Sequence, residues 1–198
     1  MINKNFNKGI FLTAIGSFWW GFFGVLYFKY ISFVGHVEVV IHRSLWTCVT
    51  LLLTTFFFSK WKIFFKLFFN KKKLFLLFIS GFLIFINWST WIYAISNNRV
   101  IDASFGYFIM PIISIFLGYF FLKEKISNKA KLAVAIVTFS ILYLIIIDFK
   151  SIPWTGLVVA ISWSVYNLVR KKINVDTDIG LLIESLFILP FITVAFYI

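Results

Sequence analysis

Long apolar runs separated by short basic clusters constrain this chain more than any other feature of its sequence. A bilayer core about 30 Å thick is crossed by roughly 20 helical residues. Runs of about that length with few charges lie at Gly9–Phe28, Val39–Phe58, Leu74–Ser96, Ala103–Leu122, Leu132–Ile147, Ile152–Val169 and Ile179–Ile198. They lack the two-residue alternation of membrane β-strands, and a helix satisfies its own backbone hydrogen bonds in lipid. We therefore expect an all-α, polytopic bundle of seven transmembrane helices.

The composition agrees with a membrane protein and argues against other classes. The chain is 62% apolar and 13% charged, whereas soluble domains are about half apolar and about a quarter charged. Its net charge of +12 comes from clusters between the apolar runs, which indicates contact with anionic lipid and not with nucleic acid. Cys48 is the single cysteine, so we expect no internal disulfide and no thiolate metal cluster.

The basic clusters predict how the chain is oriented. If seven spans alternate, 15 of the 19 basic residues fall on one side, and only Lys29, Arg99 and Lys150 fall on the other. The positive-inside rule then places the N-terminus in the cytoplasm. The stretch Lys60–Lys73 alternates Lys with aromatic residues, which predicts an amphipathic helix on the cytoplasmic lipid surface.

Similar short strings in two distant spans indicate an internal repeat. His42–Trp46 in the second run resembles Ile183–Phe187 in the seventh. If runs six and seven repeat runs one and two, the unit has five helices, and an odd-numbered unit inserts its second copy upside down. Residues 1–150 are then the first five-helix repeat, and residues 151–198 are the first two helices of a second, truncated repeat.

Longer motifs make the chain similar to a known family. The motifs are Ile41-His42-Arg43-Ser44-Leu45-Trp46, Ala103-Ser104-Phe105-Gly106-Tyr107-Phe108-Ile109-Met110-Pro111, Leu168-Val169-Arg170-Lys171-Lys172-Ile173, Leu182-Ile183-Glu184, and the pairs Asn87-Trp88 and Asn97-Asn98. Together they resemble the RarD family, in the EamA-type branch of the drug/metabolite transporter superfamily. The resemblance implies ten helices in two inverted five-helix repeats, acting as a permease in the bacterial inner membrane. Met110 departs from the polar Asn of the family pattern, which puts one polar contact near the pathway in doubt.

Two charged residues inside apolar runs are the first candidates for the substrate pathway. Arg43 and Glu184 occupy equivalent positions in the repeat, and an ionisable group at membrane depth costs several kcal/mol unless it faces a cavity or a partner. We expect the two to pair, or to flank the substrate, in the outer half of the membrane. The alternative is that each reaches the outer interface separately.

His42 and Glu184 are the candidates for a proton relay, since imidazole titrates near neutral pH. Neighbouring helical residues face different directions, so at most one of His42 and Arg43 is expected on the pathway. The alternative for His42 is a plain interfacial histidine.

Polar residues and prolines in the apolar runs complete the candidate site. Asn87, Trp91 and Tyr107 combine an amide with two amphipathic aromatic rings, which suits a mixed polar and apolar solute. Pro111 and Pro190 lie in mid-run and are expected to kink their helices. The remaining polar positions are expected to be structural: Ser114 and Gly118 in helix packing, and Asp102 as the N-cap of the fourth helix.

Four functions remain to be weighed. A secondary transporter of a small metabolite or drug is favoured, with no cofactor and no metal, and with lipid, a small-molecule substrate and a homodimeric copy as partners. The chain has no G-x-x-x-x-G-K-[ST] phosphate loop, so ATP coupling would need another subunit. A membrane-embedded enzyme lacks a cluster of catalytic residues, and a retinal protein lacks a Lys beyond Lys172. A truncated, inactive remnant of a transporter stays open as the alternative.

Overall fold

Every element of the described chain is helical. The computed structural model describes residues 4–147 and 153–197, in which no strand occurs. In chain order the elements are α1 (Lys4–Phe18), the π-helical η1 (Trp19–Gly24), α2 (Val25–Tyr30), α3 (His36–Phe57), α4 (Trp61–Phe68), α5 (Lys71–Ser96), α6 (Val100–Leu122), α7 (Asn128–Ile147), α8 (Trp154–Ile173) and α9 (Thr177–Tyr197). The prediction of an all-α bundle is confirmed.

Five of the described segments are long and apolar enough to cross a membrane. They are Asn7–Tyr30, which joins α1, η1 and α2, and the helices α3, α5, α6 and α7. Large apolar side chains cover the outer surface, and Phe108 and Phe139 are 63% and 73% exposed. A surface of this kind is unstable in water and suits lipid. The chain is therefore a multi-pass membrane protein.

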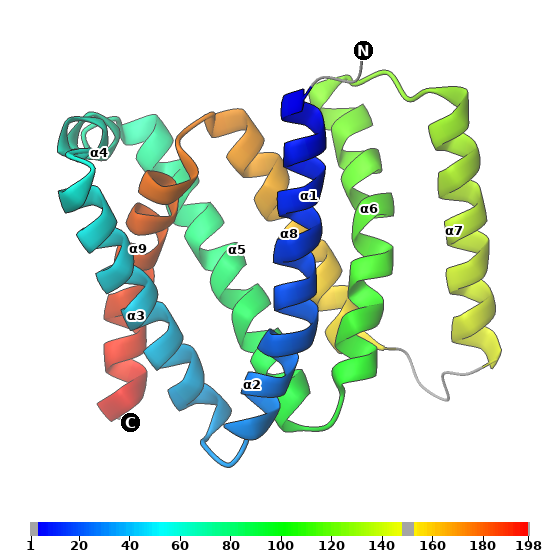
Figure 1. Cartoon of the computed structure of the whole chain (residues 1–198), viewed down its shortest axis with the longest axis horizontal. Helices are drawn as coiled ribbons and strands as arrows, with labels where there is room; N and C mark the ends of the chain where they lie inside the picture. The colour runs from blue at the N-terminus through cyan, green and yellow to red at the C-terminus, as the bar shows by residue number, and fades with distance from the viewer. Residues whose placement is uncertain (1–3, 148–152, 198) are drawn as a thin grey trace.

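Helices from the two ends of the sequence interleave in the bundle. α8 packs against α5 and α6, and α9 packs against α3 and α5 (Figure 1). α6 and α8 approach each other closely, so that a Cβ at Gly106 would lie 2.4 Å from the carbonyl oxygen of Gly156. Glycine at both positions lets the two backbones touch. This contact holds α8 in the middle of the bundle.

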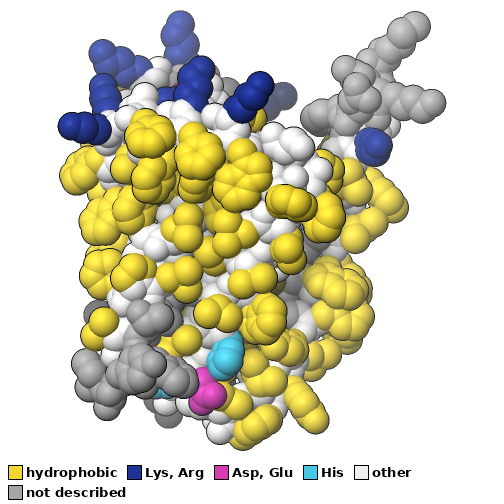
Figure 2. All heavy atoms as spheres, turned by 90° about the vertical axis from the view of Figure 1, so that its left-hand side faces the viewer, with side chains coloured by type: hydrophobic (Ala, Val, Ile, Leu, Met, Phe, Trp, Pro, Cys, Tyr) yellow, Lys and Arg dark blue, Asp and Glu magenta, His cyan; other side chains and the backbone are white. Residues whose placement is uncertain are grey.

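The basic residues gather at one end of the bundle, which we call the basic end. It carries the start of α1, α4, the connection between α6 and α7, and the turn between α8 and α9 (Figure 1). Figure 2 shows Lys and Arg side chains along this edge, above a broad hydrophobic band. Lys150 and the predicted boundary between residues 150 and 151 lie outside the described residues.

The basic aromatic stretch forms a shorter helix than predicted. The expected helix over Lys60–Lys73 is wrong in length, because α4 ends at Phe68 and α5 begins at Lys71. The side chain of Asn70 accepts a hydrogen bond from the Lys73 backbone N–H at 3.1 Å, which caps α5 and separates the two helices. Phe64 and Leu67 of α4 are buried, so α4 also packs against the bundle.

An ion pair ties this region to the start of α9. The Lys60 ammonium donates to Asp178 Oδ2 at 2.5 Å. The hydrogen bond to Asp178 raises the pKa of Lys60 above its ordinary value. The basic end is therefore stabilised by a contact between residues far apart in the sequence.

The prediction that Asp102 caps the fourth helix is wrong. α6 begins at Val100, with Arg99 at the N-cap position and Asp102 in the first turn. Asp102 instead pairs with Arg99, whose Nη2 lies 2.8 Å from Asp102 Oδ2. A carboxylate in the first turn is also favoured by the helix dipole.

Candidate functional site

A cavity of about 580 Å³ lies at the centre of the bundle. Its lining side chains come from η1, α3, α5, α6, α8 and α9, and most are aromatic or polar: Trp20, Arg43, Ile84, Asn87, Trp88, Trp91, Tyr107, Trp163, Tyr166, Asn167, Arg170, Thr177 and Leu181. Small-molecule sites in proteins have volumes of roughly 300–1,000 Å³ and combine apolar walls with a few polar groups. The cavity has the size and the lining of such a site.

The structure brings four of the predicted pathway residues to this cavity. Arg43 reaches it from α3, Asn87 and Trp91 from α5, and Tyr107 from α6. The rings of Trp91 and Tyr107 meet edge to face, with centroids 5.3 Å apart. These residues therefore share one space, although they come from three helices.

The guanidinium of Arg43 is surrounded by aromatic rings. Its Cζ lies 4.3 Å from the ring centroid of Trp88, 5.1 Å from that of Trp20 and 5.5 Å from that of Phe28. Cation–π contacts of this kind stabilise a cation by about 0.5–2 kcal/mol. Nη1 of Arg43 is buried without a hydrogen-bond acceptor, and Arg43 has no ion pair within residues 4–147 and 153–197.

The predicted pairing of Arg43 with Glu184 is wrong, because Glu184 pairs with Arg170. The Glu184 carboxylate is fully buried, and its Oε1 lies 3.5 Å from Arg170 Nη1. It also accepts hydrogen bonds from Ser80 Oγ at 2.5 Å and Tyr166 Oη at 3.2 Å. The antiparallel turn between α8 and α9 brings Arg170 to this carboxylate. Tyr166 and Arg170 both line the cavity, so Glu184 lies directly behind the cavity wall.

Arg170 is a cavity residue that the sequence reasoning missed. In the sequence it stands beside Lys171 and Lys172, a pattern that indicates a basic cluster at the cytoplasmic side. A usable signal was present, because Trp163, Tyr166, Asn167 and Arg170 follow one another at intervals of three, one and three residues, which is the pattern of a single helix face. Gly180 makes the arrangement possible, since a Cβ there would lie 1.7 Å from Arg170 Nη1.

Asn87 has a structural role at the cavity wall. Its Nδ2 donates to the carbonyl oxygen of Val159 at 3.0 Å and to Ser162 Oγ at 3.1 Å. Both partners belong to α8, so the amide ties α5 to α8. Ser114 also bonds α8, through Ser164 Oγ at 3.2 Å, which agrees with its expected place in helix packing.

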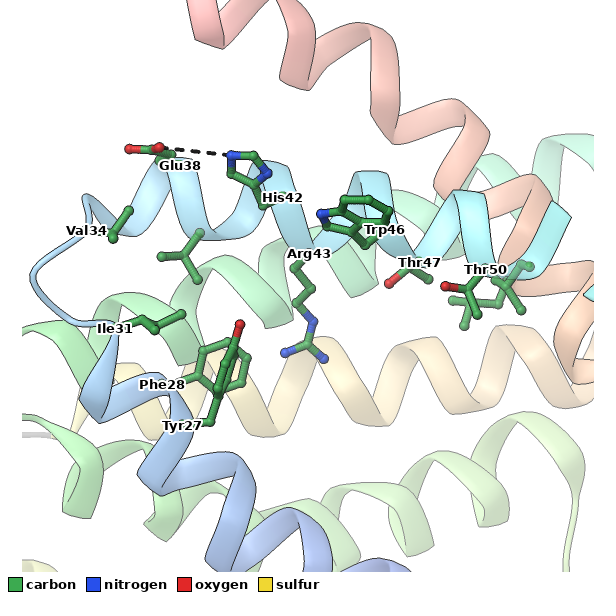
Figure 3. Close-up of a pocket in the computed structure, with 13 residues that line it drawn as sticks. Tyr27, Phe28, Ile31, Val34, Glu38, His42, Arg43, Trp46, Thr47 and Thr50 are labelled. Carbon is green, nitrogen blue, oxygen red and sulfur yellow. Dashed lines mark ion pairs between the residues drawn. The ribbon is translucent and has the colours of Figure 1, made fainter. Parts of the chain in front are cut away.

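His42 projects away from Arg43. Figure 3 shows the His42 and Glu38 side chains on one side of α3 and Arg43 on another. The His42 side chain is 58% exposed and lies 3.9 Å from Glu38. It lines a separate groove of about 830 Å³ between α2 and α3, to which Arg43 also contributes. The structure therefore does not bring His42 and Glu184 to the same cavity.

The two prolines lie inside helices, as predicted. Pro111 is in α6 and Pro190 is in α9. Close to Pro111, the carbonyl oxygen of Met110 accepts a hydrogen bond from Ser164 Oγ at 3.1 Å. In the part of the chain that the structure describes, no group of three His, Cys, Asp or Glu side chains is placed to hold a metal ion.

The chain is similar in sequence to known transporters. Residues 7–146 match the model of the EamA-like transporter family. The chain is 33% identical over 186 residues to the "Uncharacterized transporter YojE" of Bacillus subtilis, covering 92% of this chain and 62% of that protein. It is 35% identical over 187 residues to "Protein RarD" of Escherichia coli, covering 94% of this chain and 62% of that protein. A "Chloramphenicol-sensitive protein RarD" of Pseudomonas aeruginosa is 25% identical over 165 residues, which are 81% of this chain and 55% of that protein. No solved structure matches. The chain thus spans a little under two thirds of the length of the first two relatives.

Proposed function

This chain belongs to the EamA-like transporter family, and on that premise we propose that it acts as a permease that moves a small metabolite or drug across the bacterial inner membrane by secondary transport. The central cavity carries the proposal. It is large enough for a small organic molecule, and its lining residues come from η1, α3, α5 and α6 and also from α8 and α9. A transporter needs such a site in the middle of the bundle, at the interface of its repeats. We favour this function over an inactive remnant because the relatives are named transporters and because the cavity lining is already assembled.

The proposal includes a topology for the whole chain. α8 and α9 coincide with the sixth and seventh predicted runs, and we take them as two further spans, which makes seven. The basic end then faces the cytoplasm, together with the N-terminus. Residues 1–150 form the first five-helix repeat of an inverted ten-helix plan, and residues 151–198 form the first two helices of the second repeat. Lipid and a small-molecule substrate are the proposed partners, and a homodimer is one way to enclose the pathway.

Cysteine labelling tests this topology. Cys48 is replaced by Ala, and single cysteines are placed at Ser127, near the basic end, and at Ser32, in the turn after α2. A membrane-impermeant maleimide added to intact cells is expected to label the Ser32→Cys variant and to spare the Ser127→Cys variant until the cells are opened. The opposite pattern would contradict the orientation.

Substrate counterflow tests the transport function. Proteoliposomes that contain the native protein are loaded with unlabelled indole-3-acetate, indole-3-acetamide or tryptamine, and the labelled form is added outside. These probes share one aromatic ring system and differ in charge. We expect saturable, protein-dependent counterflow of at least one probe, and loss of that counterflow in Trp91→Ala, which alters the cavity wall. Gly16→Ala is the matched control, since a Cβ at Gly16 meets nothing within 4 Å. No counterflow of any probe above that of protein-free vesicles would contradict the proposed function.

A further inference from the structure

The central cavity offers hydrogen-bond donors that have no acceptor. Nη1 of Arg43 and Nε1 of Trp91 are buried without a hydrogen-bond partner, and both residues line this cavity. A buried donor that stays unpaired is costly, so such groups are normally satisfied by protein, water or a ligand. Two of them around one space indicate that the missing partner carries acceptor atoms.

The charged side chains around the cavity indicate whether that ligand is an anion or a cation. Two arginines line the cavity, and none of its lining residues carries a carboxylate. Behind the wall, Glu184 is fully buried and already bonded to Ser80, Tyr166 and Arg170. Glu38 lines the separate groove to which Arg43 also contributes, where it is 53% exposed and faces His42 at 3.9 Å. Arg170 is therefore compensated within the structure, whereas Arg43 has no ion pair among the described residues. One uncompensated positive charge remains at the cavity.

The surroundings of Arg43 leave its edge available to a ligand. The rings of Trp88, Trp20 and Phe28 approach the guanidinium, and aromatic rings attract a cation without accepting its N–H groups in ordinary hydrogen bonds. The planar guanidinium has donors along its edge, in a fork that matches the two oxygens of a carboxylate. Figure 3 shows the Arg43 side chain extending from α3 into the bundle, to one side of Phe28.

We propose that the cavity binds an organic monoanion, with its carboxylate on Arg43 and its planar apolar body against the aromatic walls. Trp91 supplies a second donor for the carboxylate, and the ring of Tyr107, edge to face with that of Trp91, forms part of the wall. A neutral molecule of the same shape leaves the Arg43 charge unpaired, and a cation is repelled by it. This inference rests on the proposed function, because it names the class of substrate for the same cavity.

Equilibrium binding of three probes that share the indole ring and differ in charge tests the inference. Labelled indole-3-acetate, indole-3-acetamide and tryptamine are bound to the native protein in nanodiscs of neutral lipid at neutral pH. We expect indole-3-acetate to bind at least about tenfold more tightly than the amide, which is the range for one hydrogen bond to a charged group. Tryptamine is expected to bind more weakly still. Equal or tighter binding of the amide or of tryptamine would overturn the inference.

Arginine variants locate the selectivity on one residue. Arg43→Gln is expected to remove most of the preference for indole-3-acetate over the amide, and Arg43→Lys to retain part of it, because the charge stays while the fork is lost. Arg99→Gln is the matched control, since it removes the same charge from a residue that does not line the cavity. An unchanged preference in Arg43→Gln overturns the inference, and the ligand comparison on the native protein stands even if this variant fails to fold.

Two further outcomes separate the inference from its premise. Counterflow of the amide or tryptamine without that of indole-3-acetate would leave the transport function in place and overturn the anion selectivity. Absence of both counterflow and binding for every probe would overturn both. Binding is repeated in nanodiscs that contain phosphatidylglycerol, because a lipid phosphate is also an anion. Loss of indole-3-acetate binding there would mean that a lipid headgroup takes the site, against the proposed small-molecule carboxylate.

Discussion

Replacing Gly156 by Ala should force α6 and α8 apart. A Cβ at Gly156 would lie 2.2 Å from the carbonyl oxygen of Asp102 and 3.1 Å from the backbone nitrogen of Gly106. Both neighbours are backbone atoms of a helix, so no side-chain rotation relieves the clash. The Cβ would have to move at least about 1.2 Å from the Asp102 oxygen, from 2.2 Å to 3.4 Å, to reach ordinary contact distance. Overpacking of a close-packed interior costs about 1–3 kcal/mol, and we expect the upper half of that range.

The free energy of unfolding measures this effect. The protein is titrated with a denaturing detergent in mixed micelles, and unfolding is followed by the fluorescence of its tryptophans. Gly156→Ala is expected to lower the free energy of unfolding by about 2–3 kcal/mol. Gly106→Ala should have a similar effect, because its Cβ would lie 2.4 Å from the Gly156 carbonyl oxygen. The double variant should lose less than the sum of the two, since helices already separated by one Cβ have room for the second.

Gly16→Ala is the control for this prediction. Gly16 lies inside α1, where an added Cβ meets nothing within 4 Å. Ala favours a helix over Gly by about 0.5–1 kcal/mol, so this variant should be unchanged or slightly more stable. If Gly156→Ala is as stable as Gly16→Ala, α6 and α8 do not approach as the structure shows, and the placement of α8 at the cavity wall fails with them.

Three further changes probe other contacts. Asn87→Ala removes the two hydrogen bonds that join α5 to α8. Because two buried acceptors lose their donor, the free energy of unfolding in the same titration should fall by about 1–3 kcal/mol. An unchanged free energy would mean that the Asn87 amide does not hold the two helices together. Gly180→Ala places a Cβ 1.7 Å from Arg170 Nη1, which is the end of a flexible side chain, so the protein should still fold while Arg170 moves away from the Glu184 carboxylate. A double-mutant cycle with Glu184→Gln should then show that the coupling energy between Arg170 and Glu184 is lost. An undiminished coupling energy would contradict this. The hydrogen bond to Asp178 raises the pKa of Lys60, so its stabilisation is present at neutral pH and is lost as the pH rises above the ordinary lysine value of 10.5. The difference in thermal midpoint between the native chain and Lys60→Gln should therefore stay constant below about pH 10 and shrink as the pH rises above 10.5. A difference that stays constant through this range would refute the assignment.

The helices could be predicted from the sequence because the lipid bilayer constrains the length and polarity of each continuous segment that crosses it. Each span must be about 20 residues long and apolar throughout, and both properties are read from consecutive residues. The order of packing could not be predicted in this way. α8 contacts α6 through Gly106 and Gly156, which are distant in the sequence. The sequence around a glycine in an apolar run does not indicate which other helix it will contact. The early end of α4 was missed for a different reason, since Asn70 acts through a single cap bond.

The candidate site was predictable where a residue conflicts with its surroundings. Arg43 and Asn87 are polar residues in apolar runs, and their burial at a cavity follows from the high cost of leaving them in lipid. Arg170 gave no such conflict, because it begins a basic cluster. The partner of Glu184 was wrongly predicted because the repeat alignment compares equivalent positions, whereas ion pairs form between neighbours in space. The turn between α8 and α9 decides that neighbourhood, and it brings Arg170 to the carboxylate.

The two arginines of the cavity differ in how their charge is balanced, and the difference bears on transport. Arg170 has a permanent carboxylate partner in Glu184, which is 0% exposed, so a ligand gains little by displacing it. Arg43 has aromatic contacts of about 0.5–2 kcal/mol each and no ion pair among the described residues, set against a burial cost of several kcal/mol. In the proposed complex, a carboxylate that enters the cavity becomes the ion-pair partner of Arg43. It is then held by one arginine and not by two, because Arg170 is already paired with Glu184. The proposed permease must release what it binds, and a single uncompensated arginine would give binding strong enough for selection yet weak enough for release on the other side.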